Sequence, residues 1–118
     1  MELAIVSEEG DVVRVDVTGN ITQDQVAVNV DLLRELLGSD VYSRTVLLSM
    51  KDAPFLDSSG VSWLLISHKR FKDNQGRLIL HSVQPTVLNV LKVLRMHLVF
   101  DLADTEADAA KMLEGEAS

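Results

Sequence analysis

Four adjacent residues, Asp57, Ser58, Ser59 and Gly60, carry the reactive chemistry that stands out in this sequence. They place a carboxylate and two hydroxyls directly at the start of an amphipathic helical pattern. An oxygen at that position can accept a hydrogen bond from a free backbone N–H, so Asp57 or Ser58 is expected to cap the helix. The free N–H groups and the dipole of a helix start also favour an anion. The run therefore predicts a helix cap at a place that can accommodate negative charge.

Other combinations of reactive side chains give weaker signals. His68, His81 and His97 show no H-x-x-x-H or equivalent spacing, and the chain has no cysteine, so neither a metal site nor thiol chemistry is predicted. Ser59 could be combined with Asp57 and a histidine into a hydrolase triad. The sequence lacks a G-x-S-x-G elbow, however, and so short a chain leaves no room for a large substrate cleft. We expect neither an enzyme nor a bound cofactor.

The secondary structure predicted around the Asp-Ser-Ser-Gly run places it between a strand and a helix. Residues 45–50 are continuously apolar, which is typical of a strand covered on both faces, and residues 51–57 have loop character. Residues 59–73 then show helical periodicity. The other predicted elements are strands at 3–7, 13–17, 77–81 and 98–100, and helices at about 23–37, from 85 onwards, and at 104–113.

The order of these elements predicts the fold class. Thr22 and Gln25 have capping-box spacing before the first helix, and Pro85 is tolerated at the first position of another. The order is β-β-α-β-α-β-α-(β)-α, whose strand–helix–strand units require right-handed crossovers. We therefore predict a single α/β domain, residues 1–113, with a mixed sheet of four to five strands and about four helices, followed by a frayed tail at 114–118.

Charge is distributed unevenly along the chain. The 11 basic and 18 acidic residues give a formal net charge of −7, which argues against general affinity for nucleic acid or an anionic membrane. Residues 41–100 nevertheless hold eight bases and three acids, so electrostatic recognition of a partner is expected there. No apolar stretch reaches the roughly 18 residues needed to span a bilayer. The acidic start Met1-Glu2-Leu3 lacks the basic region of a secretory signal, so we expect a cytoplasmic protein.

The helix predicted at 59–73 has two distinct faces at 100° per residue. Its core-facing side comprises Val61, Leu64, Leu65, His68 and Phe71. Its other side comprises Ser59, Ser62, Trp63, Ile66 and Arg70. An exposed aromatic and aliphatic pair beside a hydroxyl and an arginine has the composition of a binding hot spot, so this side predicts a partner surface. The alternative is that a neighbouring loop or helix covers Trp63 and Ile66.

The segment Phe55-Leu56-Asp57-Ser58-Ser59-Gly60-Val61 resembles the signature of the STAS family, specifically the bacterial anti-sigma-factor antagonists. The order of elements resembles that fold over nearly the whole chain. In these proteins an Asp-Ser-Ser/Thr-Gly motif opens a helix, and its second hydroxyl residue is the phosphorylation site. The resemblance places the acceptor at Ser59, with Asp57 and Ser58 before it and Gly60 after it.

Two turns of this chain depart from the family pattern. Gly19-Asn20-Ile21-Thr22 stands where these proteins usually have a Gly-Glu-Leu-Asp-like turn, so two acidic groups are missing near the expected partner surface. We include Asn20 and Thr22 in that surface. Arg95-Met96-His97-Leu98 stands where the family often has a Ser-Gly-Leu turn. Both departures bear on the identity of the partner, and neither touches the acceptor.

The resemblance implies a small switch protein that acts in transcription regulation or a stress response. Its unphosphorylated form would bind an anti-sigma factor that is also an ATP-dependent serine kinase, and would thereby free a sigma factor. Phosphorylation at Ser59 would break the complex, because burying the added charge of about −1.5 to −2 costs several kcal/mol. A serine phosphatase would reset the switch. ATP and magnesium would belong to the partner, and this chain would be a monomer without cofactor or metal.

Two alternatives stay open from the sequence. The chain could be a STAS subunit of another complex, such as a stress-signalling scaffold or a lipid-transport assembly, without control of a sigma factor. It could also be a small enzyme. Incubation with ATP and candidate kinases separates the switch from the enzyme, and the identity of the partner separates the switch from the other complexes.

Overall fold

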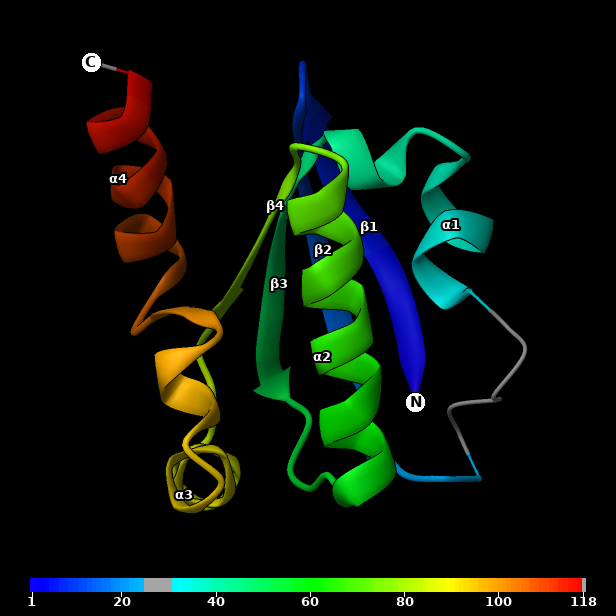
Figure 1. The fold of residues 1–118 in the computed structure, drawn as a ribbon, viewed down its shortest axis with the longest axis vertical. Helices are drawn as coiled ribbons and strands as arrows, with labels where there is room; N and C mark the ends of the chain where they lie inside the picture. Colours follow the sequence, from blue (N-terminus) through cyan, green and yellow to red (C-terminus); the bar gives the residue numbers. More distant parts are fainter. Residues whose placement is uncertain (25–30, 118) are drawn as a thin grey trace.

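A five-stranded mixed sheet lies at the centre of the computed structural model, which describes residues 1–24 and 31–117 (Figure 1). The strands are β1 (Glu2–Glu9), β2 (Val12–Thr18), β3 (Thr45–Asp52), β4 (Arg77–His81) and β5 (Asp101–Ala103). They lie in the order β1-β2-β3-β4-β5; β1 is antiparallel to β2, and the other neighbours are parallel. The predicted α/β class and mixed sheet are confirmed.

Helices cover both faces of this sheet. They are α1 (Leu32–Leu37), α2 (Ser58–Asp73), α3 (Pro85–Val93) and α4 (Glu106–Ala117), with short 3₁₀ turns η1 (Val41–Ser43) and η2 (Met96–Leu98). Buried side chains of α1, α2 and α3 join one cluster on one face, whereas α4 packs on the other. Figure 1 shows α2 along one side of the sheet and α4 on the opposite side. None of the helices in the described residues combines the length and the hydropathy that a membrane span requires.

The sequence pattern explains how each strand is buried. In β2, Val13, Val15 and Val17 are buried and alternate with partly exposed residues, because only one face of this strand is fully covered. In β3, residues 46–50 are all buried, as expected for a central strand between two helical layers. The parallel strands β2, β3 and β4 all end at the same edge of the sheet, so the loops that follow them gather there.

The structure corrects three predicted boundaries. The last strand lies at residues 101–103 rather than 98–100, because the chain first forms the turn η2 and only then pairs with β4. The first helix begins after its cap, Asp31, whereas Gln23 and Asp24 form a turn; residues 25–30, which include the predicted capping-box glutamine, lie outside the described residues. At the other end of the chain, the backbone of α4 continues past residue 113 to Ala117.

Candidate functional site

The Asp57 carboxylate holds the start of α2 in place. Its Oδ1 accepts a hydrogen bond from the backbone N–H of Gly60 at 3.0 Å, and its Oδ2 accepts one from the backbone N–H of Gln23 at 3.0 Å. These hydrogen bonds lower the pKa of Asp57, and the one from Gly60 has the larger effect. Asp57 is therefore the predicted helix cap, and it also ties α2 to the loop that follows β2.

Backbone pairing joins the loop after β2 to the loop before α2. Ile21 and Leu56 form a parallel bridge, in which the Ile21 N–H donates to the Phe55 carbonyl at 2.9 Å and the Asp57 N–H donates to the Ile21 carbonyl at 3.3 Å. Further back, the Gly19 N–H donates to the Asp52 carbonyl at 2.9 Å. The two loops thus form one hydrogen-bonded platform around Asp57, and this platform carries the predicted partner residues Asn20 and Thr22.

Gly60 lies at the closest contact of this platform. A Cβ atom at this position would come within 2.2 Å of the Ile21 carbonyl oxygen and 3.0 Å of the Leu56 Cβ. Since Cβ atoms do not approach backbone that closely, only glycine allows α2 to start so near the loop. Gly60 was predicted as part of the motif, but its contact with Ile21 depends on a pairing that the sequence pattern does not reveal.

Ser58 and Ser59 form the first turn of α2 and present the hydroxyls of the motif. Ser58 is exposed and Ser59 is partly exposed. Neither hydroxyl forms a hydrogen bond to another residue in the described part of the chain. The Gly60 N–H already donates to Asp57. A negatively charged group added to either serine would therefore not take over this hydrogen bond, and it would be repelled by the Asp57 carboxylate.

The orientation of α2 differs from the predicted one. Its buried residues are Gly60, Val61, Leu64, Ser67 and Phe71. The small residues at 60 and 67 let the helix lie close to its neighbours, which rotates it relative to a projection based on large apolar residues alone. As a result, Leu65, predicted to face the core, is 38% exposed. Trp63, predicted to be exposed, is half-buried and packs against the core cluster.

The remaining predicted partner residues differ in how exposed they are to solvent. Ile66 is 51% exposed, and Ser62 is also exposed, so both share the solvent side of α2 with Ser59. Asn20 is exposed on the platform. Thr22 is partly buried, and its hydroxyl donates a hydrogen bond to the Asp24 carboxylate.

Arg70 has an internal partner that the sequence did not indicate. Its guanidinium lies 3.1 Å from the Asp31 carboxylate and 3.5 Å from the Tyr42 hydroxyl, which itself donates to Asp31. The pKa of Tyr42 is raised to about 12, mainly by burial and to a smaller extent by the hydrogen bond to Asp31. Arg70 therefore links α2 to the cap of α1, and this contact competes with the predicted role in partner binding.

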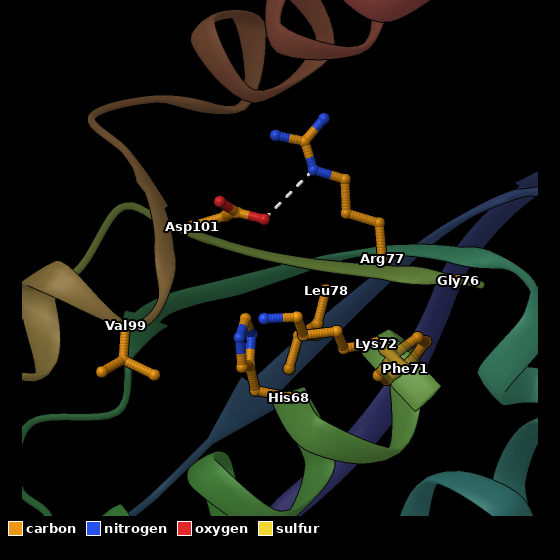
Figure 2. A pocket seen from close by; sticks show the side chains of 8 residues that line it. All are labelled: His68, Phe71, Lys72, Gly76, Arg77, Leu78, Val99 and Asp101. Carbon is orange, nitrogen blue, oxygen red and sulfur yellow. Dashed lines mark hydrogen bonds and ion pairs between the residues drawn. The ribbon is translucent and has the colours of Figure 1, made fainter. Parts of the chain in front are cut away.

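A separate cavity of about 330 Å³ lies at the far end of α2 from Ser59 (Figure 2). It is lined by His68, Phe71, Lys72, Gly76, Arg77, Leu78, Val99 and Asp101. Arg77 pairs with Asp101 at 3.1 Å, and Figure 2 shows this pair pointing away from Lys72 and His68. The basic groups therefore do not converge on one point. Among the described residues, no group of three or more His, Cys, Asp or Glu could hold a metal ion.

Comparison with known proteins identifies the family. The STAS domain model matches residues 5–109, and no curated protein matches the chain. A protein of Thermotoga maritima described as a candidate anti-sigma factor antagonist has a TM-score of 0.80 at 18% identity, covering 96% of this chain and 93% of that one. An anti-sigma-factor antagonist (STAS) domain protein of Planctomyces limnophilus has a TM-score of 0.73 at 25% identity, covering 98% of each chain.

The anti-sigma factor antagonist SpoIIAA in its unphosphorylated form is also similar. Its TM-score is 0.66 at 21% identity, and the match covers 97% of this chain and 99% of that one. The phosphorylated form of Bacillus SpoIIAA matches with a TM-score of 0.64 at 20% identity, covering 95% and 99% of the two chains. The family match spans most of the sequence, and the sheet and helices have the same overall arrangement. This chain therefore belongs to the STAS family.

Proposed function

We propose that this chain is a phosphorylation-switched anti-sigma-factor antagonist. In its unphosphorylated form it binds an anti-sigma factor that is also a serine kinase, and it frees a sigma factor for transcription. Phosphorylation at Ser59 breaks the complex, and a serine phosphatase restores the active form. ATP binds to the kinase and not to this chain, which acts as a cytoplasmic monomer.

The observation that carries this proposal is the placement of Ser59. It lies in the first turn of α2, on the solvent side, beside a carboxylate that already caps the helix. The unphosphorylated and the phosphorylated SpoIIAA both have folds similar to that of this chain, which supports a phosphorylated state without a change of fold. Ser58 is the more exposed of the two serines, so the choice of Ser59 follows the family motif.

The electrostatics of the platform favour an effect on binding over an effect on folding. The hydrogen bonds that lower the pKa of Asp57 stabilise its charged carboxylate. A phosphate of about −1.5 to −2 on Ser59 is therefore repelled by Asp57 and points towards the solvent, where a partner would sit. A partner surface without arginines opposite that phosphate would have to bury it unpaired, at a cost of several kcal/mol.

The partner surface extends along the exposed side of α2 and onto the platform. Ser62 and Ile66 follow Ser59 at helical spacing and are exposed, and Asn20 lies on the platform that Asp57 ties to α2. Ile66 supplies the apolar contact in this arrangement. The half-buried Trp63 contributes its accessible edge, and Arg70 contributes only if its pairing with Asp31 is exchanged for the partner.

Phosphate mapping tests the proposal. The chain, Ser59→Ala and Ser58→Ala are each incubated with ATP and the serine kinase of the host's sigma regulatory system, and the sites are mapped by mass spectrometry. We expect phosphate at residue 59 in the unmodified chain and in Ser58→Ala, and none in Ser59→Ala, which should still bind the kinase. Strong phosphorylation of Ser59→Ala at Ser58 would overturn the assignment.

A further inference from the structure

Residues 90–99 form an exposed apolar surface; they comprise the end of α3, the turn η2, the two residues between them and Val99. Val93 is 81% exposed and Leu98 is 71% exposed, the highest values among the large apolar side chains that the structure describes. Leu94, Val99 and Val90 are exposed as well. We call this segment the α3–η2 patch. Exposed apolar residues that gather in one place are a common feature of interaction sites.

The patch is also basic, although the protein as a whole carries a net charge of −7. Lys92, Arg95 and His97 are exposed between the apolar residues, and residues 90–99 contain no acid. Neither Lys92 nor Arg95 forms an ion pair with another residue of the described chain. The patch therefore offers cations that are available to a partner.

The backbone at Arg95 points to a use for its side chain. Arg95 has φ 61° and ψ 22°, the left-handed conformation in which glycine is preferred at the end of a helix. An arginine is less favourable there than glycine, because its Cβ crowds the backbone. A residue that keeps an unfavourable conformation at the centre of an exposed patch is a candidate for binding.

Hydrogen bonding within the patch indicates how a partner must bind. The N–H groups of Leu94, Arg95, Leu98 and Val99 all donate to carbonyls of residues three or four positions earlier. No free backbone edge is presented along this stretch for an added strand. A partner is therefore recognised through side chains, with an apolar surface against Val93 and Leu98 and acids against the two cations.

We propose that the α3–η2 patch docks an acidic amphipathic helix of a partner protein. One face of such a helix covers the apolar side chains, and its flanking carboxylates pair with Lys92 and Arg95. This contact does not require phosphorylation of Ser59. A flat anionic membrane fits less well, because the chain continues from the patch through β5 into α4 (Figure 1), whose first turn carries the acids Glu106 and Asp108.

A second copy of the chain also fits less well than a separate partner. The acidic helix α4 uses its apolar residues Ala109, Met112 and Leu113 against the sheet, so its apolar side is not available to another molecule. Among the described residues, the other exposed large apolar side chains are Ile5 and Val6 on the strand β1, Phe55 in the loop before α2, and Leu65 and Ile66 on α2, whose last turn is basic and whose first turn has no acid, so none of them lies on an acidic helix. The partner helix must therefore come from a different protein.

A titration followed by NMR tests this proposal. The probe is a synthetic peptide of about five helical turns, with leucines three and four positions apart and glutamates elsewhere, added to the isotope-labelled full chain. We expect amide shifts concentrated at residues 90–99. Lys92→Glu and Arg95→Glu should each weaken binding about tenfold. The control Lys111→Glu, a charge reversal on exposed α4, should leave binding unchanged.

Each competing result of the same titration contradicts the proposal. Equal binding of a matched peptide with lysines in place of glutamates would show that the charge of the peptide does not contribute to its recognition by the patch. Binding of phosphatidylglycerol vesicles through residues 90–99, without binding of the glutamate peptide, would assign the patch to a membrane. Concentration-dependent shifts at the patch without any peptide would assign it to self-association.

Arg95→Gly provides an independent check. Glycine suits the left-handed backbone, so this variant should raise the melting temperature by about 4 °C. It should also lower the affinity for the glutamate peptide about tenfold, because the arginine side chain is lost. A lower melting temperature, or unchanged peptide affinity, would show that Arg95 is kept for the fold and not for binding.

Discussion

The face of the sheet covered by α2 and the face covered by α4 are packed in different ways. On the α2 face, one cluster of buried aliphatic and aromatic side chains runs from β2 through α2 to α3. On the α4 face, the buried apolar cluster comprises Leu47, Ile79 and Ala109. Ser49 and His81 lie two residues after Leu47 and Ile79 on the same strands, so they face the same side of the sheet, and both are buried although they are polar. An ion pair at 3.2 Å connects Arg14 to Glu106 at the start of α4.

This difference shows which side of the domain can position a functional site. The α2 face holds its helix by apolar packing and by a backbone contact at Gly60, so the hydroxyls of α2 are presented from a rigid element. The α4 face depends on fewer apolar contacts and on groups that titrate. We therefore expect the fold and the site to be sensitive to changes on the α2 face, and the pH dependence of stability to arise in part on the α4 face.

The largest effect is expected from Gly60→Ala. The added methyl group would lie 2.2 Å from the Ile21 carbonyl oxygen, so α2 would have to move away from the platform. We expect a loss of about 3 kcal/mol or more in the free energy of unfolding, measured by urea denaturation. The neighbouring change Ser59→Ala should cost less than about 0.5 kcal/mol. Equal stability of the two variants would contradict the close contact.

Leu48→Ala and Leu47→Ala compare the two faces directly. Both side chains are fully buried on β3, one against α2 and the other against α4. We expect Leu48→Ala to cost about 4 kcal/mol and Leu47→Ala about 2.5 kcal/mol, because the smaller cluster can close around the cavity more easily. A larger cost for Leu47→Ala, in the same denaturation experiment, would reverse the proposed ranking of the faces.

Trp63→Ala and Ile66→Ala separate packing from binding on α2. Trp63 is half-buried against the core cluster, so we expect its truncation to cost about 2 kcal/mol of stability. Ile66 is exposed, so its truncation should change stability by less than about 0.5 kcal/mol. The same truncation should lower the affinity for the proposed anti-sigma factor about tenfold. If Ile66→Ala leaves that affinity unchanged, the partner surface does not run along α2.

A smaller effect is expected from His81 on the α4 face. Burial lowers the pKa of His81, against the opposing influence of the Glu106 and Asp16 carboxylates, and its Nδ1 lies 2.9 Å from the Ser82 hydroxyl. The folded protein therefore binds the His81 proton less readily than the unfolded chain does. The resulting stability is present above the unfolded pKa of about 6.5 and is lost as the pH falls below it.

His81→Gln tests this pH dependence. Thermal unfolding is followed from about pH 7.5 to about pH 5.5 for the variant and the unmodified chain. The unmodified chain should lose more stability over this range, whatever the cost of the substitution at the higher pH. Parallel losses would show that protonation of His81 does not contribute.

Much of the fold could be predicted from the sequence, because its elements carry strong local patterns. The continuous apolar run of β3, the strand β4 and the proline that opens α3 all lie where they were expected. The last strand was misplaced because residues 98–100 are apolar, yet Leu98 belongs to an exposed turn. An apolar residue in a binding patch and one in a strand look alike in a sequence.

The candidate site could be predicted only in part. The cap at Asp57 follows from residue type and position. Its second hydrogen bond, from Gln23, joins residues 34 positions apart and leaves no periodic signal. The rotation of α2 was missed because Gly60 and Ser67 are buried although neither is a large apolar residue. The pairing of Arg70 with Asp31 likewise depends on how two helices come together.

The affinity of the anti-sigma factor for the two phosphorylation states tests the central claim most directly. The partner is titrated by calorimetry into the unmodified chain and into the chain phosphorylated at Ser59, with circular dichroism spectra recorded for both states. We predict that phosphorylation weakens binding about 100-fold or more while the spectra remain superimposable. Equal affinity for both states, or loss of binding accompanied by loss of helical signal, would contradict a switch that acts at the surface of α2.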